Sequence, residues 1–280
     1  MNKEFKNTLN VRRINEDTYQ IEDDLMGSVN MYLLIGEEKA LLIDSGYGDP
    51  ALKELIASLT DKEVICVMSH GHVDHAMGAY LFEKSYLHSA DEKVFTKYAS
   101  SKALLECGLE GIGAKPRGKL RMNGYKQAIE NVARKHRDLP AKIDDVKSFD
   151  LGKRKVYWVE VPGHTLGSIA FIDTKYHFAF DGDACGNGAW LFLEESSSLP
   201  DYLKSLDHYI AILRDEHICT RWTGHSKNSE SLDPLMSLRD LVKDIIEKQA
   251  VGKKPGIPAR FRIGKARMVI KGRIAIYVKP

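Results

Sequence analysis

Residues 69–75 read Ser-His-Gly-His-Val-Asp-His, which gathers three histidines and one aspartate in a single short stretch. The preceding run EVICVMS (63–69) is apolar and β-branched, the pattern of a buried strand. In an extended segment residues i and i+2 point the same way, so His70 and His72 can converge on one ion. Asp74 and His75 can diverge toward a second ion as the chain turns into a helix. Imidazole suits Zn, Fe, Mn, Co or Ni, and carboxylates extend the range to harder ions, so the stretch predicts a metal site.

Three further blocks each place one potential ligand just after a predicted strand. In each block a glycine precedes the ligand, so the backbone can bend tightly there. A lone histidine in such a block is more often structural, but together with the first cluster the chain offers seven donors. Seven donors suffice for two four-coordinate ions that share one carboxylate and leave a position for water. The blocks are VPGHTLGS (161–168, with His164), FDGDAC (180–185, with Asp183) and TGHS (223–226, with His225).

The order of these blocks, HxHxDH and then PGHT, GD and GH, resembles the metallo-β-lactamase-fold superfamily of metallohydrolases over about residues 18–228. LLIDSG (41–46) resembles the early strand of that family, which ends in an Asp-x-Gly turn. The resemblance implies an α/β fold, an αβ/βα four-layer sandwich with metals at one edge between the sheets. It also implies a role for each ligand. One ion would be held by His70, His72 and His164, and the other by Asp74, His75 and His225. Asp183 would bridge the two ions, and Asp44 would lie behind the ligands and accept a hydrogen bond from a ring N–H.

One departure from the family indicates a subclass. Zinc β-lactamases of the main group carry cysteine where Asp183 stands, so the chain resembles glyoxalase II-like thioesterases, lactonases and phosphodiesterases more closely. Cys185 is either a substitute ligand or a small packed residue, and the second reading is favoured because free cysteines are usually buried. The expected cofactors are two divalent ions in a binuclear centre, with zinc favoured and iron or manganese as alternatives. The catalytic groups are then Asp183, which bridges the ions, and Asp74, which relays a proton.

The expected reaction is metal-dependent hydrolysis of an ester, thioester or lactone bond in a small molecule. A phosphodiesterase or nuclease with the same site is the nearest alternative, because it too needs an activated hydroxide and a stabilised oxyanion. A mononuclear iron dioxygenase and a non-catalytic metal-containing sensor also remain open. Trp190 and Phe192 follow the bridging aspartate closely enough to line a substrate pocket, although plain core packing explains them equally well.

The chain of 280 residues, 43% hydrophobic and 29% charged, is typical of a folded globular protein with alternating helices and strands. We expect one domain over 1–228, with a helical insertion at about 91–145. Residues 229–280 are expected to form a helix and a basic β-hairpin packed on that domain. The other predicted helices cover 50–60, 199–214 and 233–249. The predicted strands are 17–22, 30–36, 39–46, 63–69, 155–161, 168–174, 177–183 and 217–224, followed by ARFRIG (259–264) and RMVIKGRIAIYV (267–278).

Charge, cysteine use and hydropathy limit the class of protein. The last 30 residues contain nine Lys or Arg and no acidic residue, and the insertion is also basic (Lys115, Arg117, Lys119, Arg121). A solvated basic face explains such segments more often than a nucleic-acid site, so nucleic acid is not the expected partner. The four cysteines are scattered, which argues against a disulfide scaffold or a cysteine zinc finger. With no apolar run of about 18 residues, we expect a cytoplasmic protein without a membrane segment, and a homo-oligomer is left open.

Overall fold

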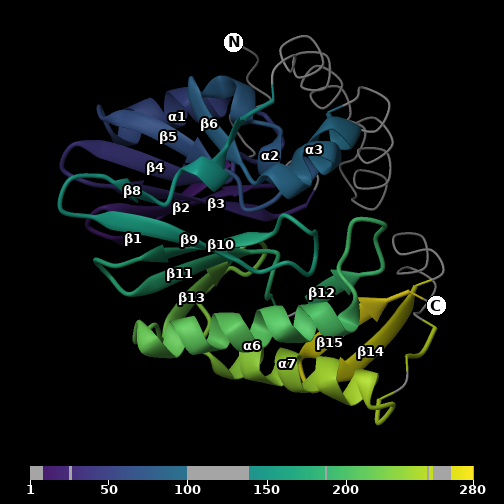
Figure 1. Cartoon of the computed structure of the whole chain (residues 1–280). Helices are drawn as coiled ribbons and strands as arrows, with labels where there is room; N and C mark the ends of the chain where they lie inside the picture. Colours follow the sequence, from purple (N-terminus) through teal and green to yellow (C-terminus); the bar gives the residue numbers. More distant parts are fainter. Residues whose placement is uncertain are drawn as a thin grey trace. The chain divides into compact units, whose positions relative to one another are not determined.

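The computed structural model describes residues 9–24, 27–99, 139–186, 188–250, 252–254 and 266–279 (Figure 1). The chain divides into two compact units, Met1–Val156 and Tyr157–Pro280. Each unit has its own hydrophobic core of buried strand and helix residues. The domain limits predicted from the sequence stay a prediction.

The first unit is built on a seven-stranded sheet whose strands follow one another in chain order. Its first four strands are antiparallel, and the last four run parallel to one another. The strands predicted at 30–36 and 39–46 are confirmed, and they form an antiparallel hairpin with Tyr32 opposite Ile43 and Ile35 opposite Ala40. The strands are β1 (Leu9–Asn15), β2 (Thr18–Asp23), β3 (Val29–Ile35), β4 (Lys39–Ile43), β5 (Glu63–Val67), β6 (Lys84–Leu87) and β7 (Ala141–Lys142).

Helix α1 (Ala51–Leu59) joins the parallel strands β4 and β5 and packs on the core of this sheet. Leu52 and Ile56, one helical turn apart, are both buried there, which is why this amphipathic segment forms a helix. The expected helix at 50–60 and strand at 63–69 are therefore confirmed within two residues. The remaining elements of the unit are short: α2 (Val73–Ala76), η2 (Ala79–Leu81), η3 (Ser89–Asp91), α3 (Glu92–Tyr98), η4 (Ile143–Asp145) and β8 (Ser148–Asp150).

The second unit contains a sheet in which β13, β11, β10 and β9 are neighbours in that order. Strands β10 and β11 form an antiparallel hairpin, and β11 runs parallel to β13. The long helix α6 connects these parallel strands, and Ser198 caps its first turn by accepting a hydrogen bond from the backbone N–H of Asp201. The elements are β9 (Lys155–Glu160), β10 (Ile169–Asp173), β11 (Phe178–Gly182), α6 (Leu199–Asp215) and β13 (Thr220–Thr223).

A small third sheet, also in the second unit, orders its strands β12-β15-β14. Its strands are β12 (Gly188–Leu191), β14 (Arg267–Lys271) and β15 (Ile274–Val278), and helix α7 (Asp233–Ile246) packs beside α6 and β15 (Figure 1). The predicted C-terminal hairpin exists, but its expected strand limits were wrong. The stretch 267–278 is not one strand: it folds back on itself at Gly272, whose φ of 61° suits a glycine turn. The other expected strand, 259–264, lies outside the described residues.

Strands β1, β6, β7, β8 and β12 were not predicted, because they are short or polar and their pairing partners supply the missing stability. Of the expected helical insertion, α3 and the residues from 139 onward are described. The basic residues Lys115, Arg117, Lys119 and Arg121 lie outside the described residues. Within the described ranges, no helix combines the length and apolar character needed to cross a bilayer.

Candidate metal centre

The first set of predicted ligands lies in the loop between β5 and α2 of the first unit. His72 is the N-cap of α2, and its extended backbone leaves His70 and His72 on the same side of the loop. His70 Nε2 and His72 Nδ1 lie 3.0 Å apart, and both rings are buried. Two nitrogens bound to one zinc ion at about 2.0–2.1 Å each are separated by a similar distance, so this pair fits a shared cation. The convergence expected from the i, i+2 spacing is therefore present.

Asp74 and His75 follow on α2 itself. His75 is fully buried, whereas the Asp74 side chain is about one-fifth exposed. His75 Nε2 lies 3.7 Å from Asp74 Oδ2, so these two ligand atoms face the same region. His75 Nε2 and a ring nitrogen of His70 also lie within 4.8 Å of each other, so the donors of this loop form one continuous cluster.

Asp44 lies behind these rings, as the family resemblance implies. It follows β4 with a φ of 63°, a left-handed conformation that aspartate tolerates better than most residues. Its carboxylate accepts hydrogen bonds from the Ser69 backbone N–H at 2.7 Å and the Ser69 hydroxyl at 2.9 Å. It also lies 2.7 Å from His75 Nδ1. An ionised carboxylate can only accept, so His75 carries its proton on Nδ1 and presents Nε2 as a lone pair.

Ser69 extends this arrangement to the next ring. Its hydroxyl proton is given to Asp44, so the hydroxyl oxygen accepts from His70 Nδ1, 3.1 Å away. His70 therefore also presents Nε2 as a lone pair. One buried carboxylate thus sets the proton positions of two predicted ligands, one directly and one through a serine hydroxyl.

The loop needs Gly71 between its histidines. A Cβ at this position would lie 2.9 Å from the Phe95 backbone N and 3.0 Å from the Asp91 backbone O. The Gly71 N–H donates to the buried Asp91 carboxylate at 2.8 Å, which ties the loop to the start of α3. Sequence reasoning missed both Ser69 and Asp91 as positioning residues, because nothing in the local pattern indicates their contacts.

The second set of ligands, His164, Asp183 and His225, is described within the second unit. Asp183 follows β11, and its Oδ2 lies 3.1 Å from His225 Nε2 and 3.9 Å from His164 Nε2. His164 is buried, whereas the side chain of His225 is nearly half exposed. His164 Nδ1 donates to the Trp190 backbone carbonyl at 3.1 Å, because a carbonyl can only accept. His164, like the two rings described above, therefore presents Nε2 as a lone pair.

A buried polar network holds the turn that carries Asp183. Asp181, two residues earlier, accepts a hydrogen bond from Tyr209 on α6 at 2.5 Å and pairs with Arg221 on β13 at 2.5 Å. Tyr202 on α6 donates to the Ala184 backbone O at 2.5 Å, just after Asp183. Both sides of the turn are thus fixed by side chains that the sequence reading missed. Burial raises the pKa of Asp181, against the lowering effects of the Arg221 charge and the Tyr209 hydrogen bond.

Cys185 ends this turn and is fully buried. Burial raises the pKa of its thiol well above the ordinary value, and the charge of Asp181 adds to this. Cys185 belongs to the hydrophobic core of the second unit. This placement favours packing over a role as a substitute ligand.

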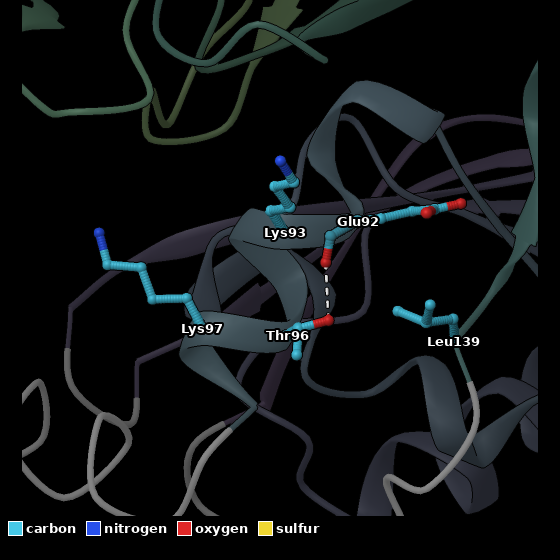
Figure 2. Close-up of a pocket in the computed structure, with 5 residues that line it drawn as sticks. All are labelled: Glu92, Lys93, Thr96, Lys97 and Leu139. Carbon is cyan, nitrogen blue, oxygen red and sulfur yellow. Dashed lines mark hydrogen bonds between the residues drawn. The ribbon is translucent and has the colours of Figure 1, made fainter.

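A hollow of about 510 Å³ is present on the first unit (Figure 2). It lies against α3, and the Thr96 hydroxyl there donates to the Glu92 backbone O of its own helix at 2.8 Å. None of the predicted ligands lines it. The residues that line it are Glu92, Lys93, Thr96, Lys97 and Leu139.

The predicted pocket residues Trp190 and Phe192 lie in the second unit, at the end of β12. Their ring centroids are 5.5 Å apart, and Trp190 also contacts Tyr277 of β15 at 6.1 Å. Trp190 is 38% exposed, so it is not a core residue.

Comparisons with known proteins identify the family of the chain. A family model described as the metallo-beta-lactamase superfamily matches residues 25–216. The human protein named acyl-coenzyme A thioesterase MBLAC2 is 25% identical over 197 residues, which cover 66% of this chain and 68% of that protein. The bovine protein of the same name is 23% identical over the same shares of both chains.

Solved structures show the same fold. The DIM-1 metallo-beta-lactamase aligns with a TM-score of 0.58 at 16% identity, over 85% of this chain and 98% of its own. A metallo-beta-lactamase from Pontibacter korlensis aligns with a TM-score of 0.59 at 13% identity, over 84% and 99%. At such identities the likeness concerns the fold alone, and it confirms the predicted fold class.

Proposed function

Because the chain belongs to the metallo-β-lactamase superfamily and is a hydrolase, we propose that it hydrolyses acyl thioesters with the help of two divalent metal ions. The observation that carries the proposal is the hydrogen-bond geometry around the Nδ1 atoms of three predicted ligands. His70, His75 and His164 each have Nδ1 beside an acceptor, which leaves Nε2 free of its proton for a cation. A group of solvated histidines would have no need of such anchors.

We propose that the donors of the two units bind the same pair of ions, as the family resemblance implies. His70, His72 and His164 would hold one ion, and Asp74, His75 and His225 the other. Asp183 would bridge them. The donor set is rich in imidazole, which favours zinc, while its two carboxylates also suit iron or manganese.

Bound divalent ions would supply Lewis-acid activation of water and of the thioester carbonyl. The residues of the chain have separate tasks. Asp44 and Ser69 keep the ring protons of the first set on Nδ1, and the Trp190 carbonyl does the same for His164. Arg221, Tyr209 and Tyr202 fix the Asp183 turn. Asp74 is the proposed proton carrier to the departing thiolate, since its side chain is partly exposed and lies at the ligand cluster.

We propose a thioester rather than an ester or a lactone as the substrate because of the names of the related proteins. Human and bovine MBLAC2 are named acyl-coenzyme A thioesterases and match two-thirds of the chain. The substrate is accordingly proposed to be a small molecule. The cytoplasmic location and the oligomeric state stay predictions.

The test joins metal analysis with a substrate panel. Protein purified without added metal is analysed for its elements and assayed with acyl-coenzyme A, nitrophenyl esters, lactones and bis-nitrophenyl phosphate. We expect about two zinc ions per chain and fastest turnover of the thioester. His72→Ala and Asp183→Ala should lose both metal and turnover, whereas the exposed α6 variant His208→Ala should lose neither.

Three results would overturn the proposal. Preferred cleavage of the phosphate diester would indicate a phosphodiesterase or nuclease. One iron per chain with oxygen uptake would indicate a dioxygenase. Tight binding of a thioester that is recovered unchanged would indicate a sensor. Full activity in His72→Ala or Asp183→Ala would refute the ligand assignment itself.

A further inference from the structure

The small sheet β12-β15-β14 has two unlike faces. Ala189, Ile276 and Val269 point inward from the three strands and belong to the core shared with α6 and α7. Alternation then puts Trp190, Tyr277 and Met268 on the opposite face, where Tyr277 is paired across the strands with both of the others. We call this side the outer face.

The outer face is apolar and accessible. Trp190 is 38% exposed and Ile270, on β14, is 57% exposed, while Tyr277 and Met268 are half-buried. The basic side chains of β14 are engaged elsewhere. Lys271 Nζ lies 2.6 Å from Asp244 Oδ2 on α7, and Arg267 donates to the Gly252 backbone O at 3.4 Å. The sheet therefore offers an apolar surface of a kind that usually marks a binding site.

This surface is joined to a predicted ligand. The Trp190 carbonyl accepts from His164 Nδ1 at 3.1 Å, and the opposite nitrogen of that ring, Nε2, faces Asp183. Ser196 donates to the carbonyls of both His164 and Trp190, at 2.9 and 3.3 Å, which holds the two residues together. One imidazole ring therefore separates the start of the outer face from the atom proposed to bind metal.

We infer that the outer face binds the acyl chain of the thioester, with Trp190 and Tyr277 as the residues that select chain length. The inference rests on the proposed function, which places the thioester carbonyl at the metals beside His164. From Trp190 the face continues over two strand spacings, about 10 Å, to Met268. A flexible hydrocarbon chain fits this run of aromatic and aliphatic side chains. The adenine ring of coenzyme A fits it less well, because the described side chains of this face offer only the Trp190 N–H and the Tyr277 hydroxyl to its several ring nitrogens.

The experiment measures kcat/KM over a series of acyl-coenzyme A thioesters from acetyl to palmitoyl. In the unaltered protein we expect a rise of about two- to fourfold per methylene until the face is filled. Trp190→Ala and Tyr277→Ala should lower the value for long chains ten- to a hundredfold, mainly through KM, and change the value for acetyl less than threefold. Trp190→Phe and Tyr277→Phe should retain most of the length preference.

Tyr176→Ala is the matched control. Tyr176 is also a half-buried aromatic residue of the second unit, but it precedes β11, whereas Asp183 follows that strand. It should leave the length profile unchanged. Ile270→Glu changes an exposed side chain, so this variant should fold normally. It should also lower kcat/KM selectively for long acyl chains.

Acyl thioesters of pantetheine, which lack the nucleotide, separate the two parts of the substrate. The same selective loss with these substrates supports the acyl site. A loss that is equal at all chain lengths, or that disappears without the nucleotide, overturns it and leaves thioester hydrolysis intact. If the unaltered protein hydrolyses no thioester of any length, the proposed function fails and this inference fails with it.

Discussion

The carboxylate of Asp44 provides the sharpest test of how this protein prepares its ligands. Three donors converge on it within 2.9 Å, namely the backbone N–H and hydroxyl of Ser69 and the Nδ1–H of His75. In Asp44→Asn the amide oxygen can keep the backbone N–H, but the amide nitrogen then faces the hydroxyl and the ring. The left-handed backbone adds no new strain, because asparagine tolerates that conformation.

The hydroxyl of Ser69 can rotate, but the imidazole cannot turn away from its buried site. His75 must therefore move its proton to Nε2, where it occupies the lone pair needed for a cation. Loss of the hydrogen-bond partner behind a metal-binding histidine lowers metal affinity about ten- to a hundredfold, or by about 1.4–2.7 kcal/mol. The metal-free protein should also lose about 1–3 kcal/mol of unfolding free energy, because two hydrogen bonds to a charged group become neutral ones.

Zinc affinity is measured by competition with a chromophoric chelator, and the proton position by ¹⁵N-resolved NMR of the histidine rings. Asp49→Asn is the control. Asp49 is equally buried in the same connection and accepts from the Ala51 N–H at 2.8 Å, so its variant makes the same chemical change without facing the His75 ring. Asp44→Asn protein that binds zinc as tightly as the unaltered chain, or that keeps the His75 proton on Nδ1, would refute this reasoning.

Three further predictions concern stability and reactivity. Arg221→Met should lower the free energy of unfolding, measured in urea, by about 3–5 kcal/mol, because it leaves the buried Asp181 carboxylate without its cation. A loss below about 1 kcal/mol would contradict the role of this ion pair. Cys219 is exposed and should react rapidly with a thiol reagent. Cys185 is buried, which raises the pKa of its thiol, so it should react only when the protein unfolds. Peptide mapping identifies the labelled residue. Partial burial would raise the pKa of Asp144, but hydrogen bonds from Ser89 outweigh it and lower that pKa. The stabilisation from Asp144 should therefore be complete above about pH 4 and be lost as the pH falls further, so Asp144→Asn should destabilise the protein at pH 6 more than at pH 3.

Local pattern was sufficient for the main elements of the fold. Alternation and β-branching located β3, β5, β10 and β11, and a 3.6-residue period located α1, α6 and α7, because each of these segments buries a continuous apolar face. Short polar strands were missed, since strands such as β12 owe their conformation to a partner rather than to their own composition. The hairpin turn at Gly272 was missed for a related reason, because an apolar run on both sides of a glycine resembles one long strand.

The proposed ligands were also predicted from the sequence, because side chains suited to metal binding follow the predicted strands with characteristic spacing. The groups that position these ligands were not. Serine, aspartate, arginine and tyrosine are common residues, and neither Ser69 nor Arg221 lies in a pattern that indicates which atom it contacts. Their roles depend on distances across strands and helices, and the buried geometry alone shows them.

The sequence by itself determined the fold class and the family, and it predicted the metal-binding residues, since periodicity marks the main elements and the spaced motif blocks resemble those of the family. The tertiary structure decided which ring nitrogen His70, His75 and His164 present and which side chains lie beside Trp190. The physical reason is the same in both cases. The proton position on a histidine ring is set by the hydrogen-bond partner of the nitrogen opposite the proposed ligand atom. The pairing of β12 with β15 brings together residues almost ninety positions apart. Neither contact is encoded in local sequence.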